Sequence, residues 1–353
     1  MDPLKLIPQP DTIPVHWGWF QLLLTITFIL HLLFMNTMLG CGMITLIREF
    51  GSGKESEDMN REMSLKLPYT VAFTVNMGVA PLLFLQVLYG HFMYTSSILM
   101  AVYWLSTVFL IILAYYCIYI YDFKFEALGQ ARRVFIAVGV ILLLWVGFIF
   151  SNNMTLMVQP EKWSQYFHNP YGTLLNLGEN TLIPRYLHFV VASVAVGGLF
   201  QALAEMFKPR TDGAEKVIRS GLNWFSGATA VQFLVGLWFL FSLPKDKMLL
   251  FLGEGRLPTF FLAAGITGGI AALYFAARNK VWSAAGAALM TIIMMVLVRD
   301  LLRSAYLKPY FSLDSLKIVP EYSPMILFLV SFAAGIMVII YMLKLASTAG
   351  KEG

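Results

Sequence analysis

Charged side chains are scarce in this sequence of 353 residues, of which Asp, Glu, Lys and Arg make up 13%. A soluble globular protein carries about twice that share. Hydrophobic residues account for 58% of the chain, and the mean hydropathy is +0.71. The sequence is therefore that of an integral membrane protein. Its net charge of +5 comes mostly from basic residues between the apolar runs, so we expect no nucleic-acid partner.

Cysteine is also scarce, and the positions of the two cysteines limit the kinds of haem attachment and metal site that the chain could form. Cys41 and Cys117 both lie in apolar runs, and neither belongs to a CxxC or CxxCH pattern. The sequence therefore argues against covalently attached c-type haem, thiolate metal sites and a disulfide framework.

Long stretches without charge predict an all-α membrane protein with about nine transmembrane helices, because one helix needs about 20 apolar residues to cross a bilayer. Residues 67–121 contain no charged side chain. That stretch has room for two spans, with a turn expected at residues 89–97. The nine expected spans cover about residues 17–47, 67–89, 97–121, 134–150, 186–204, 222–243, 257–277, 281–298 and 324–343.

The basic residues predict how the bundle, residues 17–345, is oriented. Most of the 25 Lys and Arg residues fall in the loops on one side of the spans, which places that side in the cytoplasm. The N-terminus is then periplasmic and the C-terminus cytoplasmic. We expect residues 1–16 to be an extended periplasmic segment, residues 152–184 a periplasmic loop that docks partners, and residues 346–353 a polar tail.

The five histidines are the candidate ligands, and all fall in the outer half of the expected bundle. His16 precedes the first span, His91 lies in the expected turn, and His168 lies in the long outer loop. For these three, hydrogen bonds at the membrane interface are the alternative. His31 and His188 lie inside spans, where ionisable residues are functional by default. Both could ligate haem iron or form a hydrogen bond between helices.

Three stretches carry a more specific pattern. The first span contains FQLLLTITFILHLLFMNTMLG, residues 151–160 read SNNMTLMVQP, and residues 185–198 read RYLHFVVASVAVGG. They resemble, in turn, the opening helix, the N-x-W-M-Q-x-P signature and the K-F-x-H-x-x-x-A-x-x-x-x-G helix of subunit I of the cytochrome bd quinol oxidases. The resemblance assigns His31 to a ligand of the active-site haem pair and His188 to a ligand of the low-spin b haem. It also implies a nine-span bundle in the bacterial inner membrane.

The chain departs from that family where oxygen chemistry is concerned. The family's third span carries glutamates, whereas residues 100–110 have none. Its seventh span supplies an arginine and a methionine ligand, whereas residues 259–269 contain neither. In place of a glutamate ligand on the eighth span, residues 290–303 offer methionines and Asp300, and the outer loop 244–256 is short. Oxygen reduction needs an acid-lined proton path and an open haem, and the sequence lacks the residues for both.

These observations favour an electron-transfer subunit of a respiratory complex, with one or two b-type haems and no catalytic residue of its own. His31 and His188 are the first iron ligands to test, and His91 or His16 could supply a second one. Electrons would pass between the quinone pool and periplasmic c-type cytochromes in other subunits. The chain could thus belong to a quinol-linked oxidoreductase complex.

Three other functions remain open. The chain could be a cofactor-free structural anchor for partner subunits, or a terminal quinol oxidase whose ligands have moved to new positions. A transporter fits least, because a coupling site normally needs buried charge. Arg299, Asp300 and Arg303 could form a local pair at the outer end of the eighth span, but we expect them to form an interfacial helix end with arginines reaching towards water.

Overall fold

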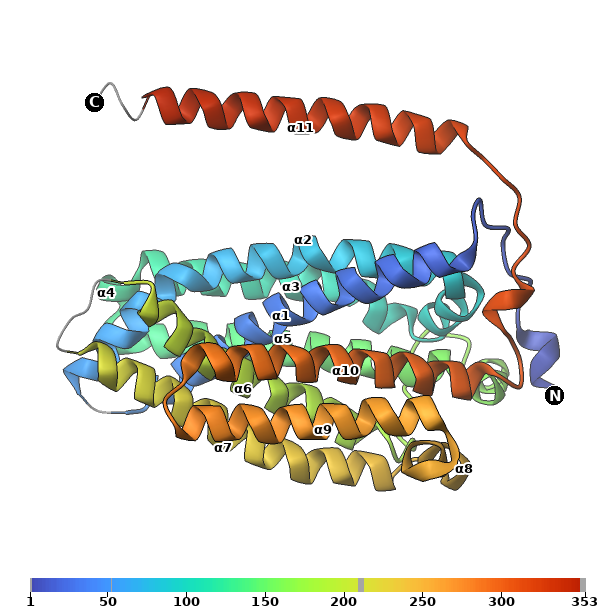
Figure 1. Ribbon diagram of the computed structural model, residues 1–353, viewed down its shortest axis with the longest axis horizontal. Coiled ribbons are helices and arrows are strands. Elements are labelled where there is room, and N and C mark those ends of the chain that lie inside the picture. Colours follow the sequence, from blue (N-terminus) through green and yellow to red (C-terminus); the bar gives the residue numbers. More distant parts are fainter. Residues whose placement is uncertain (1, 52, 209–212, 350–353) are drawn as a thin grey trace.

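The structure is a computed structural model that describes residues 2–51, 53–208 and 213–349. Within this part of the chain, nine helices are long and apolar enough to cross a membrane (Figure 1). They are α1 (Trp17–Glu49), α2 (Lys54–Leu99), α3 (Ala101–Phe123), α5 (Arg132–Met157), α6 (Leu182–Met206), α7 (Ala214–Phe241), α9 (Arg256–Ala277), α10 (Val281–Leu307) and α11 (Ser323–Ala349). The expectation of an all-α membrane protein with nine spans is therefore confirmed.

Two short helices, α4 (Phe125–Leu128) and α8 (Lys245–Leu249), lie in the connections between these spans. The long outer connection holds one more element, a 3₁₀ helix over Pro160–Phe167. The extended N-terminal segment pairs with the connection between α10 and α11, since the Ile13 amide donates to Lys317 O and the Val319 amide to Ile13 O, both at 2.9 Å. The N-terminus is thus fixed at the end of the bundle where α10 ends.

The expected turn at residues 89–97 is wrong. Helix α2 continues through it to Leu99 and is kinked at Tyr89, whose backbone angles are not helical. Polar residues made this stretch look like a turn. Their hydroxyl groups instead bond back to the preceding turn of the helix, as Thr95 does to the His91 carbonyl and Ser97 to the Met93 carbonyl. Back-bonded Ser and Thr side chains are compatible with a helix interior.

Helices α1 and α6 cross in direct backbone contact. A Cβ atom added at Gly40 would lie 1.8 Å from the carbonyl oxygen of Ser193, and one at Gly197 would lie 2.5 Å from the carbonyl carbon of Gly40. Small residues at membrane helix crossings permit this close approach, and van der Waals packing then holds the helices together. This crossing fixes α1, which carries His31, against α6, which carries His188.

Replacing Gly40 with alanine is expected to destabilise the bundle by about 1–3 kcal/mol, since overpacked sites typically lose that much. The obstacle is backbone of another helix, which cannot rotate away. The check is the thermal unfolding midpoint of the purified protein in detergent. The control is Gly286→Ala on α10, where a Cβ would meet no atom within 4 Å. Equal midpoints for the two variants would contradict the close crossing.

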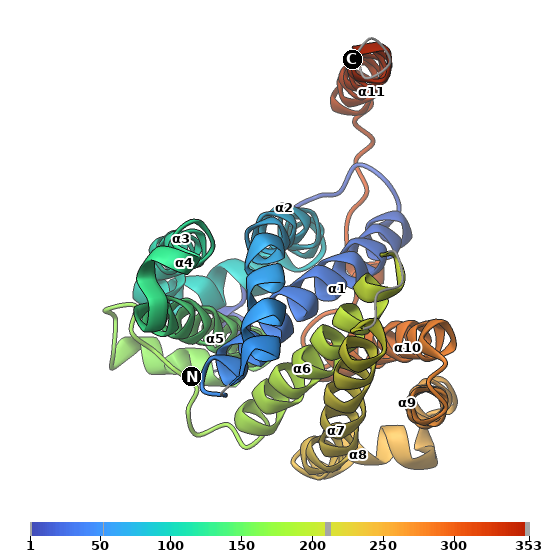
Figure 2. The same cartoon turned by 90° about the vertical axis from the view of Figure 1, so that its left-hand side faces the viewer.

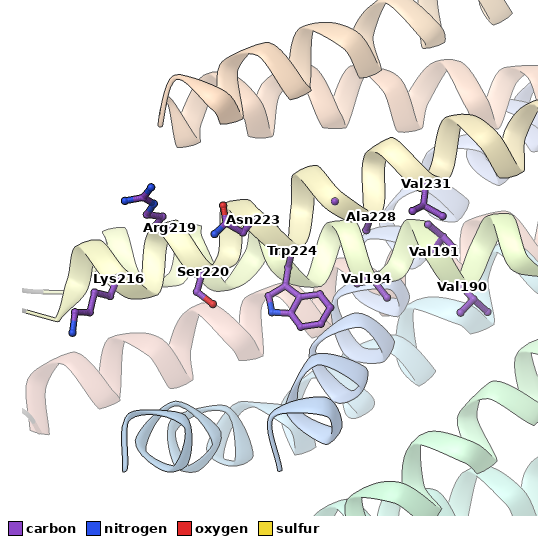
Figure 3. A pocket seen from close by; sticks show the side chains of 11 residues that line it. Val190, Val191, Val194, Lys216, Arg219, Ser220, Asn223, Trp224, Ala228 and Val231 are labelled. Atoms are coloured by element: carbon purple, nitrogen blue, oxygen red, sulfur yellow. The ribbon is translucent and has the colours of Figure 1, made fainter. Parts of the chain in front are cut away.

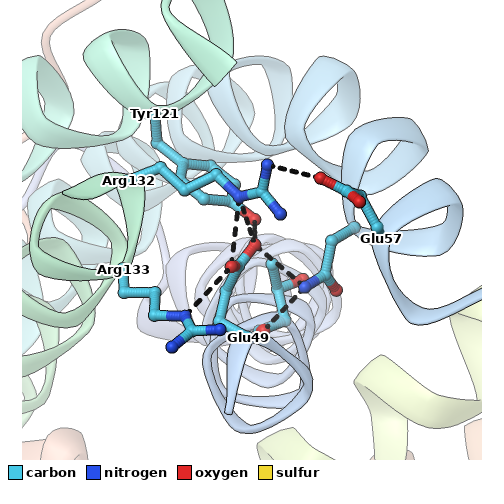
Figure 4. Close-up of polar contacts among 7 residues, drawn as sticks. Glu49, Glu57, Tyr121, Arg132 and Arg133 are labelled. Carbon is cyan, nitrogen blue, oxygen red and sulfur yellow. Dashed lines mark hydrogen bonds and ion pairs between the residues drawn. The ribbon is translucent and has the colours of Figure 1, made fainter. Parts of the chain in front are cut away.

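A buried ionic network ties four helices together at the end of α1 (Figure 4). Glu49 is 3% exposed. Its carboxylate accepts from Tyr121 Oη of α3 at 2.7 Å, from Asn60 Nδ2 of α2 at 3.0 Å and from Arg132 Nε of α5 at 3.1 Å. The Arg133 guanidinium lies 3.9 Å away. These cations offset the unfavourable position of a carboxylate at the negative end of a helix dipole.

Helix α11 stands apart from the rest of the bundle (Figures 1 and 2). None of its apolar window is buried, although this window has a mean hydropathy of 2.7. In a bilayer, lipid or another protein must cover such a helix.

Candidate functional site

His31 faces helix α2 from the middle of α1. Its Nδ1 lies 3.2 Å from the carbonyl oxygen of Thr74. A Cβ added at Gly78, one turn further along α2, would lie 2.9 Å from His31 Cε1, so this glycine makes the room that the imidazole ring occupies. When Nδ1 carries the proton, it donates to Thr74 O and Nε2 keeps its lone pair. Metal-ligating histidines are oriented by this kind of bond, which also fits the alternative of a plain interhelical hydrogen bond.

His188 faces α7 from the first half of α6. A Cβ at Gly236 of α7 would lie 3.2 Å from His188 Cε1, and the imidazole centroid lies 6.3 Å from that of Phe239. The Nδ1 atom is buried and has no hydrogen-bond partner among the described residues. A buried polar atom without a partner is unfavourable by a few kcal/mol. His188 therefore has a binding capacity that the protein itself does not satisfy.

The two membrane-embedded histidines share a local arrangement but not a common pocket. Each imidazole ring packs over a glycine of the neighbouring helix, Gly78 for His31 and Gly236 for His188. His31 contacts α2 and Phe28 of its own helix, whereas His188 contacts α7. The structure thus provides two separate candidate ligands rather than one pair facing each other.

His91 and His16 lie in different surroundings. His91 is 8% exposed, and its ring centroid lies 4.3 Å from that of Phe92 and 4.6 Å from that of Phe311. Its Nε2 is buried without a hydrogen-bond partner among the described residues. His16 is the N-cap of α1, where its Nδ1 accepts from the Gly18 amide at 3.0 Å. His91 is thus enclosed rather than interfacial, whereas one nitrogen of His16 is committed to capping.

A buried charged cluster lies where α10 packs on α1, and it overturns the expected interfacial helix end. Arg303 is 5% exposed and forms an ion pair with Asp300 at 2.9 Å. The other Asp300 oxygen accepts from Gln21 Nε2 of α1 at 2.9 Å. Arg299 Nη1 lies 3.5 Å from Asp300, and its guanidinium stacks over Phe28. These arginines are held inside the bundle because α1 supplies Phe28 to Arg299 and Gln21 to Asp300, and Tyr89 of α2 lies under the Arg303 guanidinium.

Arg185 places a further cation close to His188. It lies three residues earlier on α6, and its guanidinium carbon is 5.1 Å from the centre of the Phe239 ring, the same ring that neighbours His188. Its Nε is buried without a hydrogen-bond partner among the described residues. Sequence reasoning gave Arg185 no role. The signal was present as R-x-x-H, because residues three apart share one face of a helix.

Within the described residues, no group of three or more His, Cys, Asp or Glu side chains is placed to hold a bare metal ion. Haem iron has different requirements, because the porphyrin supplies four ligands and the protein adds only one or two axial ones. The relevant feature is therefore a single histidine with a free ring nitrogen. His31 and His188 have this feature.

No protein-family model and no curated protein sequence matches the chain. Among solved structures, the fold is similar to that of a chain of the bd oxidase from Geobacillus thermodenitrificans, with a TM-score of 0.68 over 96% of each chain and a sequence identity of 13%. This likeness covers the whole bundle, and at that identity it shows the fold. The chain is a multi-pass membrane protein with a bd oxidase-like helical bundle.

Proposed function

We propose that this protein is a membrane electron-transfer subunit of a respiratory complex and holds one or two b-type haems in a bd-type bundle. The observation that carries the proposal is the state of the two embedded histidines. The Nδ1 atom of His188 is buried and has no hydrogen-bond partner among the described residues, and His31 is oriented by Thr74 O with Nε2 available. Both lie on helices of a fold that a bd oxidase chain shares.

The residues around these histidines fit a haem. His188 and His31 would each provide an axial nitrogen, and His91 or His16 would be the candidates for a second ligand. Arg185, with its buried unpaired Nε, is suited to pair with a propionate carboxylate by a charge-assisted hydrogen bond. When bound, a b-type haem supplies reversible one-electron chemistry at its iron.

The protein's own residues would orient and shield this chemistry. The Thr74 carbonyl fixes the ring of His31 and raises the basicity of Nε2. Phe239 and the apolar lining of α7 keep water from His188. Residues 100–110 at the start of α3 contain no acidic side chain, so this stretch supplies no carboxylate for a proton path. Electron transfer without oxygen reduction is the chemistry that this set of residues supports.

The basic loops and the exposed surfaces together support a position for this chain in a membrane complex. We place the N-terminus in the periplasm and the C-terminus in the cytoplasm of a bacterial inner membrane, as the basic loops indicate. The exposed helix α11 and the outer connection between α5 and α6, residues 158–181, would be the surfaces for partner subunits. Quinone would exchange electrons at the bundle, and periplasmic c-type cytochromes in other subunits would complete the path.

The proposed function is tested by the haem content and reducibility of the purified protein. We expect one or two haems per chain, released intact by acid-acetone because no CxxCH attachment exists. A reduced quinone analogue should reduce them in the complex, without oxygen uptake above the background rate. Sustained oxygen uptake would instead indicate an oxidase with relocated ligands.

One observation favours a second function, the cofactor-free membrane anchor. His31 already has a partner in Thr74 O and fills the space over Gly78, as a purely structural histidine would. A purified complex that assembles fully and contains no haem in this chain would establish that function.

A further inference from the structure

A groove of about 880 Å³ runs along α6 and α7 (Figure 3). One face of α7 forms the floor of the groove. Along this face, the side chains change from charged at one end to apolar at the other. Lys216, Ser220, Asn223, Gly227 and Val231 lie on this face at spacings of three or four residues. A polar end and an apolar end in one continuous groove match the shape of an amphiphile.

The apolar end is open and accessible from the bilayer. Helix α6 contributes the valines at 190, 191 and 194, and α7 contributes Ala228 and Val231. A Cβ placed on Gly227 would meet no atom within 4 Å, so the space above this glycine is unfilled. Only 6% of the apolar window of α7 is buried inside the protein. The groove can therefore receive a hydrocarbon chain from the side.

The polar end is cationic. Lys216 and Arg219 lie in the first turns of α7 and are exposed. Behind the groove, Arg48 of α1 donates to the hydroxyl of Ser220 at 3.1 Å and also lies beside Glu62 and Glu205, so the cationic character of the groove comes from Lys216 and Arg219. The lining contains no acidic side chain among the described residues. Trp224 lies between the two ends, as tryptophan does at the boundary between headgroups and hydrocarbon.

The length of the groove agrees with one leaflet of a bilayer. At a helical rise of 1.5 Å per residue, the stretch from Lys216 to Val231 is about 22 Å long. One leaflet with its headgroups is about 20–22 Å thick. The basic residues thus lie at headgroup level when Val231 approaches the midplane.

We infer that this groove binds one anionic phospholipid from the leaflet that contacts Lys216 and Arg219. The lipid phosphate would lie against these two side chains, and an acyl chain would follow Gly227 towards Val231. Basic pockets between transmembrane helices are the sites that favour anionic lipid headgroups, and the phosphate accepts charge-assisted hydrogen bonds from a guanidinium.

The test is a lipid titration of the delipidated protein, with any subunits that co-purify, followed by native mass spectrometry. The probes are phosphatidylglycerol and phosphatidylcholine with identical acyl chains. We expect one phosphatidylglycerol to bind at least tenfold more tightly than phosphatidylcholine. Arg219→Gln should remove this preference, and Arg278→Gln, at an exposed arginine just past α9, should keep it.

A second variant tests the apolar end. Gly227→Leu places a side chain in the open space, where an added Cβ meets no atom within 4 Å, and should weaken binding of both lipids by about tenfold. Gly286→Leu, at an equally open site on α10, is its control. Equal affinities for the two lipids, or wild-type binding in both Arg219→Gln and Gly227→Leu, would overturn the inference.

Discussion

Replacing His188 with alanine is expected to lower the occupancy of the proposed haem by more than about tenfold. In the proposal, the His188 imidazole supplies the nitrogen that binds the haem iron. Loss of a residue that only hydrogen-bonds to a metal ligand typically weakens metal binding 10- to 100-fold, and loss of the ligand itself should weaken it at least as much. The measurement is haem per purified chain, determined as the pyridine haemochromogen, with helix content checked by circular dichroism.

Two further variants make this result specific. His168→Ala changes an exposed histidine at the end of the Pro160–Phe167 3₁₀ helix and should leave the haem content unchanged. His188→Met keeps an axial ligand that haem iron accepts, so it should restore part of the haem with a shifted spectrum. A His188→Ala protein that carries the wild-type amount of haem would exclude His188 as a ligand.

Replacing Glu49 with glutamine is expected to reduce the free energy of unfolding by about 3 kcal/mol. Breaking a buried ion pair by removing one partner typically destabilises a protein by 3–5 kcal/mol, because the other charge is left uncompensated. The lower end applies here, since Arg132 keeps its ion pair with Glu57 at 2.9 Å. The measurement is the unfolding midpoint in detergent, for example in a denaturant titration followed by tryptophan fluorescence.

The control for Glu49 comes from the same network (Figure 4). Glu57→Gln removes the other carboxylate of Arg132, but the Glu57 side chain is 51% exposed. Exposed ion pairs contribute less than about 1 kcal/mol. A similar loss of unfolding free energy in both variants would show that burial of Glu49 does not determine the stability of this end of the bundle.

The number of spans could be predicted from the sequence because charge is unfavourable in hydrocarbon, so each span contains a long apolar run. The ends of the helices could not be predicted equally well. Helix α2 passes through residues 89–97, where hydroxyl groups bond to the preceding turn and the rings of His91, Phe92 and Phe311 pack together. Phe311 is distant in sequence, so no local pattern could reveal that contact.

The candidate site was likewise only partly visible. His31 and His188 stand out in the sequence because each is an ionisable residue inside an apolar run. The glycines that make room for their rings could not be identified, since the role of a glycine depends on which side chain faces it from another helix. The burial of Arg303 could not be predicted either, because it too depends on side chains from other helices. Arg303 pairs with Asp300, and Asp300 accepts a hydrogen bond from Gln21 of α1, which is 279 residues away in the sequence.

The central claim is that the embedded histidines hold haem, and one comparison tests it most directly. The measurement is the dithionite-reduced minus oxidised absorption spectrum of the purified wild-type protein and of the double variant His31→Ala/His188→Ala. We predict a b-type α band in the wild-type protein that is absent from the double variant at equal protein concentration. A wild-type protein without this band, or a double variant with an undiminished band, would contradict the claim.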